Sequence, residues 1–224
     1  MENQTKMTRR FTSPVVLLGA GRLYEPDKPL ISNLNLPIIC ADGGFQAAGS
    51  LGVKPELIIG DRDSVRPEDI GNTPYIYDSD QNTTDFDKSL AHVTAPMRLC
   101  FGFWGKRLDH SLAALSSLTR STAKGAILVG EEDICFCAPA EFQLELPAGT
   151  PIGFYPLTDV TAKSSGLKYP LDGLTLSPTG RLGTSNETTG NLELSDVNGK
   201  LLVILPRDQL SSAAKSFGVN IPAD

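Results

Sequence analysis

The chain has 224 residues, enough for one large domain or two small ones with a substantial buried core. Its 20 Lys and Arg residues against 26 Asp and Glu residues give a formal net charge of −6, which argues against a general nucleic-acid or anionic-membrane surface. No segment approaches the roughly 18 apolar residues of a membrane span, and the first 13 residues contain no long apolar signal region. We therefore expect a cytoplasmic protein with a loose N-terminal tail over residues 1–13, and neither a nucleic-acid nor a membrane partner.

The four cysteines, Cys40, Cys100, Cys135 and Cys137, lie in or beside apolar runs, where free thiols usually behave as small buried hydrophobes. Their placement predicts a reducing compartment. A single residue separates Cys135 from Cys137, which is not zinc-finger spacing. The sequence therefore argues against a zinc site.

Residues 14–125 alternate short apolar runs with helical stretches, a pattern typical of βαβ units around a mainly parallel sheet. The predicted strands are 15–18, 38–41, 57–59, 75–77 and 99–103, and the clearest predicted helices are 84–93 and 109–121. Ligands of open α/β sheets collect at the carboxyl ends of strands, and each polar motif described below follows such a run. The pattern therefore predicts an α/β N-terminal domain with its ligand site at that edge.

From residue 126 to residue 224 the pattern changes to short β-type segments, such as 141–146 and 201–205, separated by Gly and Pro. Asn198-Gly199 predicts a hairpin turn before the second of these segments. We expect an all-β sandwich domain here, with no separate linker and no internal repeat. The polar stretches 164–171 and 183–187 are predicted to be turns of this domain.

Two carboxylates, Asp61 and Asp63, follow the apolar run 57–59. Side chains alternate along a strand, so we expect both acids on one face of an extended segment. Paired carboxylates suit Mg²⁺, which is bound by one or two carboxylates together with phosphate oxygens and water. A turn-forming Asp pair explains the same residues without any metal.

The segment 78–88 strengthens the metal interpretation. Thr83 or Thr84 can cap a helix whose first turns hold Asp85 and Lys88, and residues three apart meet on one helix face. Asp85 could then add a carboxylate to the metal while Lys88 offers its charge to a phosphate. A capped, solvated helix start is the alternative, and it accounts for Asp87 better than for Lys88.

Glycine-bearing turns follow two other predicted strands. Residues 19–21 could bring backbone amides near a phosphate, although a plain tight turn explains them equally well. Asp42 precedes two glycines that permit close backbone approach, which places another acid at a strand end.

The loop 102–110 combines glycines, two cations and a helix N-terminus, which suits anion binding. Arg107 is the residue expected to contact phosphate. Asp109 could instead be the N-cap of the next helix, and His110 is expected to have only a minor positional role.

These segments together resemble thiamin pyrophosphokinase (thiamine diphosphokinase), from about residue 15 to about residue 205. The corresponding segments, in chain order, are 41–44, 60–64, 81–88, 105–110, 165–171 and 185–186. The resemblance implies an ATP-binding catalytic domain over residues 14–125 and a thiamine-binding and dimerisation domain over residues 126–224. It also implies a homodimer with active sites at the subunit interface, which converts thiamine and ATP into thiamine diphosphate and AMP.

The resemblance also implies roles for individual residues. Asp61, Asp63 and Asp85 would hold Mg²⁺ and, with Lys88 and Arg107, carry catalysis. The remaining residues implied to bind ATP or substrate are Asp42, Gln81, Thr84, Asp109, Ser185 and Asn186. Of these, Ser185 and Asn186 would lie near the nucleotide or the thiamine of the neighbouring subunit.

Two residues depart from the family pattern without removing an implied ligand. Arg62 replaces an apolar or aromatic residue between the two aspartates, and Lys106 stands where glycine is common.

Two other functions stay open on the sequence alone. One is a diphosphokinase or nucleotide hydrolase that uses another small acceptor. The other is a non-catalytic thiamine- or nucleotide-binding regulator, which would be expected to lack a cluster carboxylate or Lys88.

Overall fold

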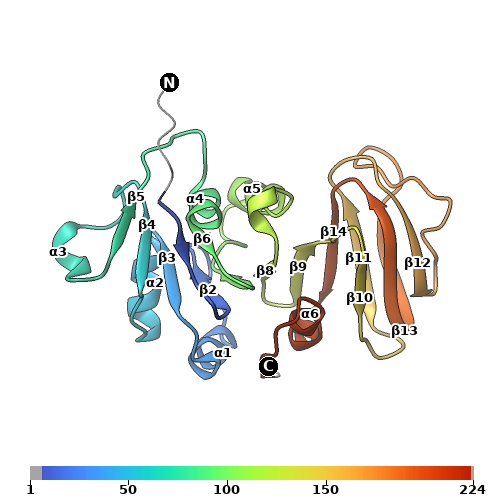
Figure 1. The fold of residues 1–224 in the computed structure, drawn as a ribbon, viewed down its shortest axis with the longest axis horizontal. Helices are drawn as coiled ribbons and strands as arrows, with labels where there is room; N and C mark the ends of the chain where they lie inside the picture. Colours follow the sequence, from blue (N-terminus) through green and yellow to red (C-terminus); the bar gives the residue numbers. More distant parts are fainter. Residues whose placement is uncertain (1–6, 223–224) are drawn as a thin grey trace.

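Parallel strands form the half of the sheet that contains the N-terminal part of the chain (Figure 1). The computed structural model describes residues 7–222. In spatial order, these strands are β8 (Ala126–Val129), β7 (Arg98–Phe101), β2 (Val15–Leu18), β3 (Ile38–Ala41), β4 (Leu57–Gly60) and β5 (Tyr75–Tyr77). Each neighbouring pair among them is parallel.

The chain fills this half of the sheet in two directions from β2. Strands β3, β4 and β5 follow toward one edge, and the chain then returns to β7 on the other side of β2. The strand order therefore reverses between β2 and β7, the kind of position where open α/β sheets bind ligands. The loops after these strands approach so closely that a Cβ at Gly19 would lie 2.4 Å from the carbonyl oxygen of Gly102. A glycine is required here because any side chain would collide with that backbone.

Helices cover both faces of the parallel strands. The longer ones are α1 (Asp27–Leu34), α2 (Gly44–Leu51), α4 (Asp85–His92) and α5 (Leu108–Ser117). Val16 and Leu18 of β2 share a buried cluster with α1 and α2, whereas Val15 and Leu17 share another with α4 and α5. Successive strand side chains point to opposite faces, so burial on both sides explains why β2 is continuously apolar.

The C-terminal part of the chain is rich in antiparallel strands. They are β9 (Asp133–Cys137), β10 (Phe142–Leu144), β11 (Pro151–Pro156), β12 (Thr161–Leu167), β13 (Gly183–Asn198) and β14 (Leu201–Pro206). Strand β9 pairs antiparallel with β8, and β14, β11 and β13 continue from it. One mixed sheet thus runs across the expected boundary near residue 126, and the division into two domains stays a prediction.

Strand β13 joins two layers of this β-rich part (Figure 1). Its first residues pair with β11, whereas the segment from Thr188 onward pairs with β12 and, between Leu192 and Leu194, with β10. Phe154 of β11 and Leu192 belong to the same buried cluster. The two layers therefore enclose a common apolar core.

The remaining short elements are β1 (Arg9–Arg10), β6 (Val93–Thr94), α3 (Pro67–Ile70), η1 (Ser121–Ala123), η2 (Arg207–Gln209) and α6 (Leu210–Ser216).

Two expectations about connecting segments are wrong. Residues 9–11 are not a loose tail, because β1 pairs in parallel with β6 and the Phe11 N–H donates to the Thr94 carbonyl at 2.8 Å. Residues 1–6 of the expected tail lie outside the described residues.

The turn at Asn198-Gly199 does not close a hairpin, because β11 lies between β13 and β14. Gly199 has φ 119°, and a Cβ there would lie 2.4 Å from the Asp159 carbonyl oxygen. The glycine thus serves a close approach of two loops.

A buried ion pair joins the first helix to the end of β14. Nη1 of Arg207 lies 2.7 Å from Oδ1 of Asp27 and also donates to the carbonyl of Gly130 at 2.7 Å. The two charged side chains are 8% and 1% exposed. Removing one partner of such a pair leaves the other charge buried, which lowers the stability of the fold.

Among the described residues, no helix is both long enough and apolar enough to cross a membrane.

We predict that Arg207→Met lowers the free energy of unfolding by about 3 kcal/mol, because Asp27 loses its buried cationic partner. Lys163→Met is the matched control, since Lys163 pairs with Asp196 on the surface, and we expect little change from it. Urea unfolding followed by circular dichroism measures both. Equal stability of Arg207→Met and wild type would contradict a structural role for the buried pair.

Candidate active site

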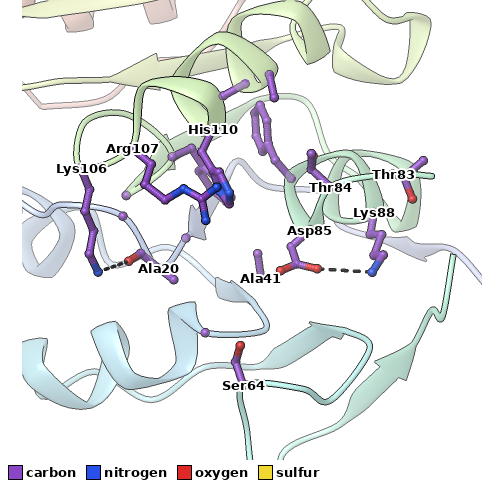
Figure 2. Close-up of a pocket in the computed structure, with 18 of the residues that line it drawn as sticks. Ala20, Ala41, Ser64, Thr83, Thr84, Asp85, Lys88, Lys106, Arg107 and His110 are labelled. Carbon is purple, nitrogen blue, oxygen red and sulfur yellow. Dashed lines mark hydrogen bonds and ion pairs between the residues drawn. The ribbon is translucent and has the colours of Figure 1, made fainter. Parts of the chain in front are cut away.

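A cavity of about 470 Å³ lies at the carboxyl ends of the parallel strands (Figure 2). Its walls come from the loops after β2, β3, β4, β5 and β7 and from the first turns of α4 and α5. Of the residues expected to form the site, the lining includes Asp61, Asp63, Gln81, Thr84, Asp85, Lys88 and Arg107. The sheet therefore brings together side chains that are as far as 46 residues apart in the sequence, from Asp61 to Arg107.

Three carboxylates meet beside this cavity: Asp61 and Asp63 line it, and the fully buried Asp42 lies next to them without being among the described residues of the lining. Asp42, Asp61 and Asp63 each offer an oxygen within 4.8 Å of the others. The expected third member, Asp85, is not part of this group. Asp42 belongs to it because Asp42 directly follows β3, which pairs with β4, so that the loops after these two strands lie together.

The segment that carries Asp61 and Asp63 is a tight turn and not an extended strand end, which corrects the expectation. Arg62 has φ 66°, in the left-handed region, and the Asp63 N–H donates to Oδ1 of Asp61 at 3.4 Å. This bond is typical of aspartate turns. The turn and metal interpretations are thus compatible, because the same turn draws the two carboxylates toward Asp42.

Burial raises the pKa of Asp42 above its ordinary value, and the nearby acids Asp63 and Asp85 raise it further. Hydrogen bonds to Oδ1 from the Tyr75 hydroxyl (2.7 Å) and to Oδ2 from the Ser64 N–H (3.0 Å) act in the opposite direction. A divalent cation would relieve the remaining repulsion among the carboxylates. Their hard oxygen donors therefore fit Mg²⁺ well.

Lys88 is the buried cation of the site. Its side chain is only 2% exposed, and its ammonium lies 3.2 Å from Oδ2 of Asp61. It also lies 3.4 Å from Oδ1 of Asp85 (Figure 2). Burial would lower the pKa of Lys88, but the hydrogen bond to Asp61 and the charge of Asp85 outweigh it and raise the pKa. Lys88 is therefore a fixed positive charge between two carboxylates.

The same lysine affects the two acids differently. Burial would raise the pKa of Asp61, but hydrogen bonds from Lys88 and from Nε2 of Gln81 (3.2 Å) outweigh it, and the pKa is lowered. Asp85 has a raised pKa, because its burial outweighs the attraction of Lys88. The two carboxylates that share one ammonium thus differ in how readily they hold a proton.

A capping box fixes the start of α4. Oγ1 of Thr84 accepts the Asp87 N–H at 3.1 Å, and the Asp87 carboxylate accepts the Thr84 N–H at 3.2 Å. Asp87 is also paired with Arg120 at 3.1 Å. The expected cap is therefore confirmed, but the helix start is not solvated at Asp87, whose side chain is only 6% exposed. Asp85 and Lys88 of the same helix line the cavity.

The cations of the β7–α5 loop lie across the cavity from Lys88 (Figure 2). Arg107 points into the cavity, and its Nε donates to Oδ1 of Asp109 at 3.0 Å. Asp109 does not cap α5, because the N-cap residue is Arg107, and Asp109 is not among the described residues that line the cavity. Nζ of Lys106 donates to the Ala20 carbonyl at 3.4 Å. His110 also lines the cavity, and the minor positional role expected for it stays a prediction.

Ser185 and Asn186 lie in the C-terminal part, away from the residues that line this cavity. The stretch 183–187 is the first part of β13, and residues 164–167 belong to β12, so the prediction of turns is wrong there. The Asn186 side chain is buried and bonds to both the N–H (3.1 Å) and the carbonyl (2.7 Å) of Tyr169. Any contact of these two residues with a ligand stays a prediction.

Tyr75 and Gly102 are functional candidates that the sequence analysis missed. Tyr75 is an ordinary aromatic strand residue in the sequence, and only the pairing of β4 with β5 shows that its hydroxyl reaches Asp42. Gly102 was recognised only as part of a loop. Its value of φ, 71°, and its contact with Gly19 show that it shapes the cavity.

Comparisons with known proteins decide the family. The family model described as the thiamin pyrophosphokinase catalytic domain matches residues 30–129, and the one described as the thiamin pyrophosphokinase vitamin B1 binding domain matches residues 141–197. The chain belongs to the thiamin pyrophosphokinase family. The first match contains the carboxylates, Lys88 and Arg107, so every charged side chain that lines the cavity lies within the catalytic part of the family.

Relatives and solved structures of this family agree with that assignment. Thiamine pyrophosphokinase 1 of Oryza sativa subsp. japonica is 27% identical, and the match covers 66% of this chain and 70% of the relative. The crystal structure of thiamin pyrophosphokinase from Geobacillus thermodenitrificans has a TM-score of 0.71 at 22% identity, covering 88% of this chain and 99% of that one. Thiamin pyrophosphokinase from Candida albicans also has a TM-score of 0.71, at 15% identity, with 92% and 95% of the two chains covered.

We predict that Lys88→Met lowers the melting temperature at pH 7, because Asp61 and Asp85 lose the charge that stabilises them. The lowered pKa of Asp61 contributes stability above the pKa of an unfolded aspartate, about 3.9, and this contribution is lost as the pH falls below that value. The difference between the variant and wild type should therefore shrink from pH 7 to pH 3.5. Lys54→Met, at an exposed position, is the control for loss of a charge. A difference that does not depend on pH would contradict this reasoning.

Proposed function

We propose that this protein is a thiamine diphosphokinase that transfers the diphosphoryl group of Mg-ATP to thiamine, giving thiamine diphosphate and AMP. The observation that carries the proposal is that a group of three carboxylates, one buried lysine and a glycine turn meet at one cavity of a thiamin pyrophosphokinase family chain, with two of the three carboxylates in its lining. Enzymes of phosphoryl transfer work mainly by positioning and by neutralising charge. Both can be provided by the side chains around this cavity.

The triphosphate would lie between the two groups of cations. Lys88 borders the cavity on the α4 side, and Lys106 and Arg107 border it on the α5 side. The backbone of residues 19–21 lines the same cavity, and its two glycines allow it to lie directly against the backbone of Gly102. Gln81 and Thr84 add polar groups at the same wall.

Asp42, Asp61 and Asp63 would hold Mg²⁺, and Asp85 lies close enough to the cluster to raise the pKa of Asp42. When bound, the ion supplies charge neutralisation at the phosphate oxygens. Lys88 keeps Asp61 ionised and so ready to act as a ligand. We therefore place Asp42 among the proposed metal ligands and Asp85 beside them.

In the proposed reaction, the hydroxyl oxygen of thiamine forms a bond to the β-phosphorus of ATP. The bond between the β-phosphorus and the oxygen bridging to the α-phosphorus breaks, and that oxygen leaves with AMP. The hydroxyl proton needs an acceptor, and the carboxylates of the cavity are the acceptors at hand. Arg107 would orient the polyphosphate through hydrogen bonds in place of its present contact with Asp109.

We also infer that the chain acts as a homodimer, with Ser185 and Asn186 near the partner's site. Leu108 and Leu112 of α5 support this, because these apolar side chains beside the cavity are 75% and 58% exposed. Tyr169, next to Asn186, is 60% exposed. The cytoplasmic location expected from composition stays a prediction.

The function is tested by incubating purified protein with ATP, Mg²⁺ and thiamine and separating the products by chromatography, with thiamine omitted in a control. We expect AMP and thiamine diphosphate in equal amounts, and no AMP without thiamine. ADP with thiamine monophosphate would mean an ordinary kinase, and breakdown of ATP without thiamine would mean a hydrolase. Either result, or no turnover at all, would overturn the proposal.

We predict that Asp63→Asn lowers kcat by about a hundredfold or more, because it removes a charge from the proposed metal site. Asp63 is exposed, so the fold should be kept. Asp69→Asn is the matched control, since Asp69 pairs with Arg66 on the surface and should not affect turnover. Wild-type turnover of Asp63→Asn at saturating Mg²⁺ would rule out the metal assignment.

We predict that Arg107→Ala lowers kcat/KM for ATP by about tenfold to a hundredfold, the loss expected for charge-assisted hydrogen bonds to phosphate. Arg66→Ala removes another exposed arginine, which lies outside the cavity lining, and should leave kcat/KM unchanged. Steady-state kinetics with varied ATP measure both. An unchanged value for Arg107→Ala would reject the proposed contact.

A further inference from the structure

Asp42 is held in an unusual backbone conformation. Its φ is 25°, in a region that residues with side chains rarely adopt, and its side chain is fully buried. The neighbouring strand leaves space for it, since a Cβ at Gly60 would lie 2.5 Å from the Cβ of Asp42. The position of the Asp42 carboxylate therefore depends on the groups that hydrogen-bond to it.

Two donors fix the Asp42 carboxylate, and each takes one oxygen. The Ser64 N–H donates to Oδ2 at 3.0 Å, and the Tyr75 hydroxyl donates to Oδ1 at 2.7 Å. The Ser64 bond comes from the turn that carries Asp61 and Asp63. The Tyr75 bond comes from β5, a strand that contributes no other side chain to the acidic cluster.

The Tyr75 hydroxyl also accepts a bond from the other side of the cluster. The Arg62 N–H, midway between Asp61 and Asp63, donates to it at 3.0 Å. This contact closes a chain of bonds from the turn after β4, through Tyr75, to Asp42. One hydroxyl therefore sets the position of the buried carboxylate relative to the two exposed ones.

The side chain of Arg62 in turn holds the tyrosine ring. Its guanidinium lies 4.7 Å from the ring centroid of Tyr75 and 5.8 Å from that of Tyr77. Such cation–π contacts at exposed sites are weak but favourable. The arginine that departs from the family pattern is thus the residue that packs on Tyr75.

We propose that Tyr75 is a positioning residue for the metal site, which aims the Asp42 carboxylate at the ion through its hydroxyl and is held in place by Arg62. This inference rests on the metal site of the proposed function. Groups that hydrogen-bond to metal ligands orient them, and their loss typically costs about tenfold to a hundredfold in metal affinity. Tyr75 is not among the described residues that line the cavity, so its effect would pass through Asp42.

The test compares Tyr75→Phe with Tyr77→Phe in a titration of the substrate-free protein with Mn²⁺, followed by electron paramagnetic resonance. Both variants lose one hydroxyl, but only Tyr75 bonds to Asp42. We expect the Kd for Mn²⁺ to rise about tenfold or more in Tyr75→Phe and to stay within about twofold of wild type in Tyr77→Phe. Equal affinities of Tyr75→Phe and wild type would overturn the inference.

A double-mutant cycle separates positioning from a general loss of structure. In the background of Asp42→Asn, the change Tyr75→Phe should weaken Mn²⁺ binding far less than it does alone, because its route to the metal is already broken. Full additivity of the two changes would contradict a route through Asp42. Should Tyr75→Phe fail to fold, the variant Arg62→Gly tests the inference in its place. Glycine readily adopts the left-handed φ of residue 62, and this variant keeps the Tyr75 hydroxyl but removes the guanidinium that packs on the tyrosine ring. We expect the Kd for Mn²⁺ to rise about twofold to fivefold, whereas an unchanged Kd would overturn the inference.

The two proposals fail in different ways. If wild-type protein does not bind Mn²⁺, the metal site of the proposed function is wrong. If wild type binds Mn²⁺ and Tyr75→Phe binds it equally well, the metal site stands and the role of Tyr75 is wrong.

Discussion

The charge balance at the end of the parallel strands is the constraint on which the site depends. Asp42, Asp61, Asp63 and Asp85 converge there, and among the described residues Lys88 is the only buried ammonium that contacts any of them. One positive charge cannot offset four negative ones at short range. The protein tolerates this because buried hydrogen bonds and an ion pair hold the carboxylates. In the proposed function, this excess of negative charge would favour a divalent cation that binds together with a polyphosphate.

The topology of the sheet explains why these groups meet. The strand order reverses between β2 and β7, so the loops after five strands open onto one cavity. Gly19 and Gly102, whose backbones lie against each other, both line this cavity, and the capping box at Thr84 fixes the start of α4, the helix that carries Lys88. The apolar strands are covered by helices on both faces, which leaves their carboxyl ends as the place for polar chemistry.

Local features of the site could be predicted from the sequence. The helix that carries Asp85 and Lys88 was predicted from their spacing and the preceding threonines, and the structure confirms that helix and its cap at Thr84. Strands such as β2 and β3 were predicted because burial on both faces leaves a continuous apolar run. These features depend on residues close together in the chain.

Long-range features could not be predicted in the same way. The bond from Tyr75 to Asp42 joins residues 33 apart, and it depends on the order of β3, β4 and β5. The left-handed turn at Arg62 was missed because arginine rarely adopts it. Polar segments such as 183–187 were predicted as turns, but pairing with β11 makes them a strand.

The most direct test of this account is a calorimetric titration of ATP into the metal-free protein, repeated with Mg²⁺. The carboxylates of the cavity should repel a free triphosphate, so we expect weak or undetectable binding of ATP alone and clear binding of Mg-ATP. Equal affinity for ATP with and without Mg²⁺ would contradict the claim that the acidic cluster holds a cation between protein and phosphate.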